Sequence, residues 1–188
     1  MIYLGDYMKK NIEKEYKILV TKEQFYSLLE RYPNITFESQ TNYYIDTENQ
    51  MLRAMQGAMR IRHINNQYIF TLKLPSEKGL LEFEKEVASA SLESLEDEKI
   101  KNLLEQYHID GNFQFTTKLH TQRAIHRTPY AELCFDISTY NQITDYEIEY
   151  EYLCEHDGLQ AFQDILKPIQ VIYTKNCDSK IKRALDSL

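Results

Sequence analysis

The sequence predicts an α+β fold in which a closed antiparallel β-barrel encloses charged side chains and helices pack outside it. Three observations support this. Charged and apolar residues alternate in several stretches, most of these stretches carry charges of one sign, and helical patterns lie between them. Successive side chains of a strand point to opposite faces, so each stretch would have one charged and one apolar face. Helices can cover the apolar faces from outside, and closure removes the sheet edges.

The charged rows are nearly uniform in sign after the first row, which is mixed. The first, at residues 12–18, places Glu13, Glu15 and Lys17 on one face. The later rows are cationic at Arg60, Arg62, Lys73, Arg123 and Arg127, and acidic at Glu82, Glu84, Glu86, Glu147, Glu149 and Glu151. A solvated sheet face is the commonest origin of such alternation, but it would mix its charges with neutral polar residues. Segregated rows instead indicate strands that present cations and carboxylates to a shared volume.

Four helices are expected between or after these strands. Thr21 and Gln24 form a capping-box pattern that opens a helix extending to about Tyr32. Ser91 or Ser94 would cap a second helix, whose apolar stripe ends at residue 104. A third is expected over residues 158–166, before Pro168, and a short basic one over residues 178–188.

Length and composition exclude several classes of protein. The 188 residues suit one domain, and we expect a core over about residues 11–185 with a flexible segment at 1–10. A formal net charge of −7 leaves no basic excess for binding nucleic acid. No apolar run is long enough to span a bilayer, and the first residues lack the apolar core of a signal peptide. The three cysteines have no metal-type spacing and indicate reduced thiols. We therefore expect a cytoplasmic protein that binds neither nucleic acid nor membrane.

The order of the charged motifs resembles that of CYTH domains, also called triphosphate tunnel metalloenzymes. The stretch Glu13-Lys14-Glu15-Tyr16-Lys17 is similar to the E-x-E-x-K signature at the start of these domains. The following elements occur in the same order as in the family: Arg60-x-Arg62, Thr71-x-Lys73, Glu82 and Glu84, Arg123, Asp136, Glu147-x-Glu149, and Ser179-Lys180. Together they span nearly the whole chain, and they most resemble the single-domain, adenylate cyclase-like branch of Gram-positive bacteria.

The resemblance implies an eight-stranded antiparallel tunnel that binds a triphosphate together with Mg²⁺ or Mn²⁺. The residues that it places on phosphate are Lys17, Arg60, Arg62, Lys73, Arg123 and Lys180. The metal-ligand candidates are Glu13, Glu15, Asp136, Glu147 and Glu149. The residues expected to take part most directly in catalysis are Lys17, Arg62, Glu82 and Glu149. Gly79-Leu80-Leu81 and Thr121 stand where many relatives carry basic residues, which leaves the identity of the substrate open.

The chemistry of these residue types agrees with the resemblance. Guanidinium groups match phosphate oxygens in geometry, and hard divalent ions take oxygen ligands. The first hypothesis is a metal-dependent triphosphatase acting on inorganic triphosphate or a related organic triphosphate, with water oriented by a metal ion or by Glu82 or Glu149. The alternatives are a class IV-type adenylate cyclase, a thiamine triphosphatase and a non-catalytic binder of polyphosphate or nucleotide. The partner in each case is a small molecule, and the chain is either a monomer or a homodimer.

Some of the charges also have a purely structural interpretation. Glu82, Glu84 and Glu86 can pair with cations on neighbouring strands without touching a ligand. Arg127 and Arg183 are expected at the rim or on a helix surface, away from any ligand.

Overall fold

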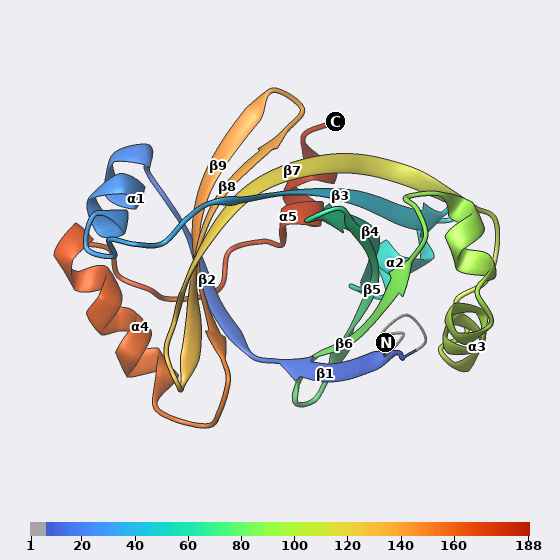
Figure 1. The fold of residues 1–188 in the computed structure, drawn as a ribbon, viewed down its shortest axis with the longest axis horizontal. Helices are drawn as coiled ribbons and strands as arrows, with labels where there is room; N and C mark the ends of the chain where they lie inside the picture. The colour runs from blue at the N-terminus through green and yellow to red at the C-terminus, as the bar shows by residue number, and fades with distance from the viewer. Residues whose placement is uncertain (1–6) are drawn as a thin grey trace. The chain divides into compact units, whose positions relative to one another are not determined.

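The computed structural model describes residues 7–188. They contain nine strands, five α-helices and two short 3₁₀ helices (Figure 1). The strands are β1 (Lys9–Glu13), β2 (Glu15–Val20), β3 (Glu38–Thr47), β4 (Ala58–Ile64), β5 (Gln67–Ser76), β6 (Gly79–Val87), β7 (Phe113–Arg127), β8 (Ala131–Tyr140) and β9 (Ile143–Tyr152). The helices are α1 (Lys22–Leu29), α2 (Met51–Ala54), η2 (Leu92–Glu96), α3 (Glu98–Gln106), α4 (Gly158–Leu166), η3 (Lys167–Ile169) and α5 (Lys180–Asp186).

The chain divides into two compact units. The first contains residues 40–119 and the residues up to Ile12, and the second contains residues 13–39 and 120–188. The hydrogen-bonded strand order is β1-β6-β5-β4-β3-β7 in the first unit and β7-β8-β9-β2 in the second. The antiparallel α+β fold is thereby confirmed. The single domain and the closure of the strands into a barrel stay predictions.

The number of strands differs from the expected eight. The first charged stretch is not one strand, because Lys14 separates β1 from β2. The flexible segment predicted at residues 1–10 falls partly outside the described residues, and its last two residues, Lys9 and Lys10, begin β1. Among the described residues, no helix combines the length and apolar character that crossing a membrane requires.

In the first unit, the apolar faces of β4, β5 and β6 share one core with α3. The antiparallel register sets Ile61 opposite Phe70 and Met59 opposite Leu72, so the uncharged positions of the alternation lie together. The α3 residues in the same core are Ile100, Leu103 and Leu104. Each such fully buried side chain contributes about 1.5–3 kcal/mol relative to an exposed one. The opposite face of these strands is left to the charged residues.

In the second unit, α1 and α4 cover the apolar face of β2, β8 and β9. Figure 1 shows both helices on the same side of these strands. Phe25 of α1 and Phe162 of α4 are fully buried in one core with Phe135 of β8 and Ile148 of β9. The predicted packing of amphipathic helices on apolar strand faces is correct for α1, α3 and α4.

The last helix, α5, departs from that prediction. It lies on the other side of β8 and β9 from α1 and α4 (Figure 1), and it directs Lys180 and Arg183 at acidic side chains of β8 and β9. Helix α5, which was expected at the surface, therefore places its cations on the charged face of the second unit.

The residues that cap the helix N-termini explain which helix boundaries the sequence could predict. Both bonds of the capping box between Thr21 and Gln24 are present, although α1 ends at Leu29 instead of Tyr32. The α4 bounds agree with the prediction, and Ser179 caps α5, which is shorter than expected. The second predicted helix is divided into η2 and α3. Ser91 stands at the N-cap position of η2 but its side chain makes no capping hydrogen bond, and neither predicted serine caps α3. Asp97 caps α3 by accepting the N–H groups of Lys99 and Ile100, since a carboxylate there also interacts favourably with the helix dipole.

Candidate functional site

Three carboxylates converge on the charged face of the second unit. Asp136 of β8 lies opposite Glu147 of β9, and Glu149 follows two residues later on the same face of β9. One oxygen from each of the three lies within 4.8 Å of the others, and all three side chains are buried. Three buried carboxylate oxygens form a donor set that suits Mg²⁺ or Mn²⁺, so the residues present fit the metal ion expected from the sequence.

Two cations contact this group, which we name the carboxylate triad (Asp136, Glu147 and Glu149). Lys180 Nζ lies 2.8 Å from Asp136 Oδ2 and 2.6 Å from Glu149 Oε1, and it also contacts Glu147 Oε1. Arg123 forms a two-pronged contact with Asp136, with Nε 2.7 Å from Oδ1 and Nη2 2.5 Å from Oδ2, and Nη2 also reaches Glu149. Burial of the acids is tolerable because each has a cationic partner.

A second layer of contacts surrounds Glu147. Arg183 Nη2 lies 2.5 Å from Glu147 Oε2, as an ion pair without hydrogen-bond geometry, and Arg183 Nε donates to Asp145 Oδ2 over 2.8 Å. The Tyr140 hydroxyl donates to the same Asp145 oxygen. The Cys177 thiol is 3.6 Å from Glu147 Oε2. The triad is therefore held from the side of α5 and its preceding loop as well as from the strands.

The pKa values of the two glutamates of the triad are shifted in opposite directions. Burial raises the pKa of Glu147 to about 7, and the charge of Glu149 adds to the rise while Lys180 opposes it. Burial also acts to raise the pKa of Glu149, but Lys180 and Arg123 outweigh it and hold that pKa well below its ordinary range. Burial acts to lower the pKa of Lys180, yet the three acids keep it well above its usual value. At neutral pH, Glu149 and Lys180 are therefore both charged.

Two further predicted residues lie on the neighbouring strand β2. Lys17 is paired with Glu149 in the register of β2 and β9, and its ammonium lies 2.5 Å from Glu15. Asn176 accepts the backbone N–H of Lys17 over 2.8 Å, which fixes the loop before α5 to this strand. Glu15 lies opposite Glu151 in the register and is not part of the triad. Glu13 is buried at the end of β1 and also lies outside the triad.

The first unit carries its own charged face, which holds the other predicted residues. Arg60 lies opposite Thr71 across β4 and β5, and Arg62 Nε donates to Asn42 Oδ1 over 3.0 Å. Lys73 forms an ion pair with Glu82 at 3.1 Å, and Glu84 lies 3.9 Å from Lys9. The pairing of Glu82 with a cation on the adjacent strand agrees with the structural interpretation of this row.

Sequence reasoning missed one member of the site. Arg183 was expected on a helix surface, but its side chain is only 11% exposed and contacts two acids of β9. Its spacing of three residues from Lys180 puts both cations on one face of a helix, and this spacing was the available signal. Arg127, by contrast, is 70% exposed and pairs with Glu132, as expected for a rim residue.

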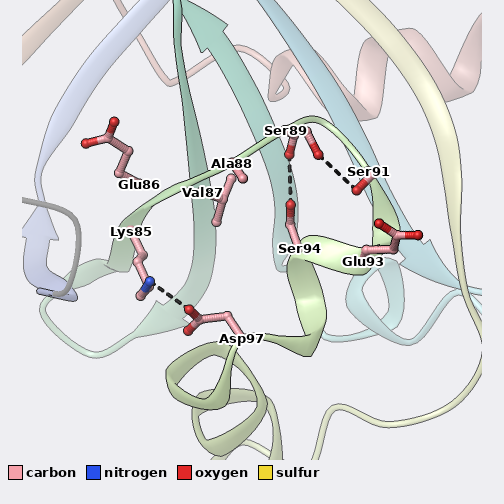
Figure 2. Close-up of a pocket in the computed structure, with 9 residues that line it drawn as sticks. All are labelled: Lys85, Glu86, Val87, Ala88, Ser89, Ser91, Glu93, Ser94 and Asp97. Carbon is pink, nitrogen blue, oxygen red and sulfur yellow. Dashed lines mark hydrogen bonds and ion pairs between the residues drawn. The ribbon is translucent and has the colours of Figure 1, made fainter.

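A pocket of about 410 Å³ lies in the first unit, between the end of β6 and the start of α3 (Figure 2). It is lined mainly by serines and acids, and the buried Lys85 ammonium inside it lies 2.8 Å from Asp97. Asp97 is already occupied by this pair and by the cap of α3. Lys85 and Asp97 therefore serve the local fold.

The CYTH domain family matches residues 11–184 of the chain. The chain belongs to the CYTH family. A curated relative, "Putative triphosphatase YjbK" of Bacillus subtilis, is 34% identical over 170 residues, which cover 87% of this chain and 90% of that protein. The region matched by the family contains the carboxylate triad and every residue predicted for the site.

Solved structures of similar proteins agree with the CYTH fold. A crystal structure described as a "putative adenylate cyclase" from Bacillus halodurans has a TM-score of 0.82 and 31% identity, covering 93% of this chain and 97% of that one. HpAC1 from Hippeastrum has a TM-score of 0.75 and 22% identity, with 94% and 95% covered. HpAC1 carries the name of an adenylyl cyclase and is described as having a dominant triphosphatase activity.

Proposed function

We propose that this CYTH protein is a metal-dependent triphosphatase that removes the terminal phosphate of inorganic triphosphate or of a related organic triphosphate. The observation that carries the proposal is the carboxylate triad with Arg123 and Lys180 in direct contact with it. The acids of the triad can bind a hard divalent ion, and the cations beside them can bind phosphate oxygens, so both kinds of ligand lie close together. The similarity to YjbK supports the same activity.

The residues of the triad would hold the ion, and a bound Mg²⁺ or Mn²⁺ would neutralise negative charge on the phosphate oxygens. Arg123, Lys180 and Lys17 would bind phosphate oxygens and stabilise the charge that shifts to the leaving group. Catalysis of phosphoryl transfer depends mainly on such positioning and electrostatic stabilisation. We also propose phosphate contacts for Arg60, Arg62 and Lys73, which form the cationic rows of the first unit.

Water is the nucleophile in this proposal. Its oxygen attacks the terminal phosphorus while the bond from that phosphorus to the bridging oxygen breaks. The water protons pass to solvent or to a carboxylate, and the products of triphosphate are orthophosphate and pyrophosphate. Glu149 stays charged at neutral pH, because its pKa is held low, and a charged carboxylate can accept a hydrogen bond from the attacking water. Glu82 is the second candidate for this role.

The second candidate function is an adenylate cyclase, which the similarity to the Bacillus halodurans protein favours. In that reaction the ribose 3′-hydroxyl attacks the α-phosphorus of ATP and pyrophosphate leaves. Both reactions use the same charge pattern for the phosphates, so the products distinguish them.

The experiment is to incubate the purified chain with a panel of triphosphates (inorganic triphosphate, ATP and thiamine triphosphate) and with Mg²⁺ or Mn²⁺. We expect orthophosphate release from at least one of them, with no cyclic AMP. Cyclic AMP and pyrophosphate from ATP would establish the cyclase instead. Tight binding of every triphosphate without turnover would contradict both enzymes and leave a binding protein.

A further inference from the structure

Arg183 bridges two acids on β9, and only one of them belongs to the carboxylate triad. Its Nε donates to Asp145 Oδ2 over 2.8 Å, and its Nη2 forms the ion pair with Glu147 Oε2 at 2.5 Å. Asp145 also accepts the hydroxyl of Tyr140, and Arg183 Nη1 donates to the backbone oxygen of Asp178. These contacts hold the guanidinium plane from three sides.

Because of this bridge, both oxygens of Glu147 are held by cations of α5. Lys180 contacts Oε1 and Arg183 contacts Oε2. Lys180 Nζ contacts Asp136 and Glu149 as well, so Oε1 of Glu147 shares this ammonium with one oxygen of each of the other two acids. A rotation of the Glu147 carboxyl group would remove Oε1 from the triad. The contact to Oε2 opposes that rotation.

We propose that Arg183 is a positioning residue for metal binding, which keeps Oε1 of Glu147 directed at Asp136 and Glu149. The inference rests on the proposed function, because it assumes that the triad binds a divalent ion. A planar guanidinium suits this role, since it can contact two carboxylates in fixed directions, whereas the point charge of a lysine cannot. Partners outside the ligands themselves commonly set ligand orientation in metal sites, and their loss typically weakens metal binding about 10–100-fold.

The test measures Mn²⁺ binding by isothermal titration calorimetry, without substrate. We compare the wild type with Arg183→Gln, Arg183→Lys and Asp145→Asn, and use Lys182→Gln as the control. Lys182 lies on the same helix, its side chain is 54% exposed and it pairs with Asp178 and Asp186, so its replacement removes the same charge away from the triad. Thermal melting of every variant reports folding.

We expect Arg183→Gln to weaken Mn²⁺ binding about 10–100-fold, Arg183→Lys and Asp145→Asn to weaken it less, and Lys182→Gln to leave it unchanged. A purely structural role would lower the melting temperature of the Arg183 variants without a selective loss of affinity. Wild-type affinity in folded Arg183→Gln would overturn the inference. If that variant does not fold, wild-type affinity in both Arg183→Lys and Asp145→Asn would overturn it.

The outcomes also separate this inference from the proposed function. A wild type that binds no Mn²⁺ would contradict the metal-dependent mechanism and the positioning role together. A wild type that binds Mn²⁺ and hydrolyses triphosphate, with an equally tight Arg183→Gln, would contradict only the role of Arg183.

Discussion

Glu147 and Glu149 lie two residues apart on one strand face, yet their pKa values shift in opposite directions. Both side chains are buried, so desolvation acts on both in the same direction. The difference comes from the cations. Lys180 and Arg123 lower the pKa of Glu149 strongly enough to overcome burial. At Glu147 the lowering by Lys180 and Arg183 does not overcome burial, and the charge of Glu149 adds to the rise. The charged form of Glu149 is therefore the more strongly favoured of the two, and Glu149 is the first residue to test.

We expect Glu149→Gln to lower kcat about 10²–10³-fold, because the loss of one preorganised electrostatic contact costs about 3–4 kcal/mol. The amide is nearly isosteric with the carboxylate but lacks its charge, so high metal concentration should restore part of the rate. Steady-state kinetics of the best triphosphate, at moderate and high Mn²⁺, measures this.

Glu151→Gln is the matched control on the same strand face, outside the triad. This change should lower kcat much less than Glu149→Gln does. Equal rates for folded Glu149→Gln, Glu151→Gln and the wild type would refute the assignment of Glu149.

Arg62→Ala tests the cationic face of the first unit. If Arg62 binds phosphate in both the ground state and the transition state, the change should raise KM, and kcat falls as well only where Arg62 binds the transition state more tightly. Arg53→Ala, at an exposed position of α2, removes a charge of the same kind as a control. Unchanged kinetics for a folded Arg62→Ala would remove Arg62 from the phosphate-binding set.

At the scale of elements, short-range patterns could be predicted and long-range partners could not. The capping box at Thr21 depends on residues three apart, so the sequence alone identified the start of α1. Lys85 interrupts the apolar positions of β6, and its partner Asp97 lies on a different element twelve residues later. The pattern of β6 therefore gave no sign of this buried pair, and the prediction placed the cap of α3 at a serine.

The same limit applies to the candidate site. The order of motifs placed Asp136, Glu147 and Glu149 among five metal-ligand candidates, but only the register of β8 and β9 and the docking of α5 select these three. Arg183 was misassigned for the same reason, because its helix was expected on an apolar face.

Replacement of Asp97 should destabilise the protein through the loss of two contacts, the cap of α3 and the ion pair with Lys85, of which Figure 2 shows the ion pair. Asp97→Ala removes the cap of α3, which is typically worth about 1 kcal/mol, and removes the ion pair that Asp97 forms with the buried Lys85 ammonium. We expect a loss of about 2–3 kcal/mol in total, discounted because a third of the Asp97 side chain is exposed. Asp97→Asn keeps a hydrogen-bond acceptor for the cap and should lose less. Urea unfolding measures both variants, and losses within about 0.5 kcal/mol would show that neither contact matters.

The pair should also make stability depend on pH. Burial acts to raise the pKa of Asp97, but Lys85 and the backbone N–H groups of Ile100 and Lys99 outweigh it, so the pKa lies below its ordinary value of 3.8. A lowered pKa of an acid gives stability that is present above 3.8 and is lost as the pH falls through the folded-state value. The difference in unfolding free energy between the wild type and Asp97→Asn should therefore shrink below about pH 4. A difference that grows on acidification would contradict this.

At the scale of the whole molecule, the chain is acidic, but a divalent ion must still compete with a cation that already contacts the carboxylate triad. The formal net charge is −7, yet Lys180 already occupies the centre of the carboxylate triad. An incoming divalent ion must displace or share the contacts of this ammonium. Phosphate oxygens offer Lys180 new partners, so we expect the ion and the triphosphate to bind more tightly together than separately.

Chelation should abolish activity reversibly. We expect no turnover after treatment with EDTA and recovery with Mg²⁺ or Mn²⁺, because the triad offers oxygen ligands that suit these ions. In the same samples, the ion together with a non-hydrolysable triphosphate analogue should raise the melting temperature more than either alone, since ligands that bind the folded state stabilise it. Full turnover in excess chelator would contradict the metal requirement.

The surroundings of the three free cysteines decide which of them can be labelled chemically. Cys134 is fully buried beside the triad, and burial raises its pKa far above the ordinary thiol value. Burial raises the pKa of Cys177 to about 12, and the charge of Glu147 adds to this. Because only thiolates react readily, neither residue should take up a maleimide near neutral pH. Cys154 is exposed after the end of β9, so the unmodified chain offers a single attachment point for a fluorophore or spin label.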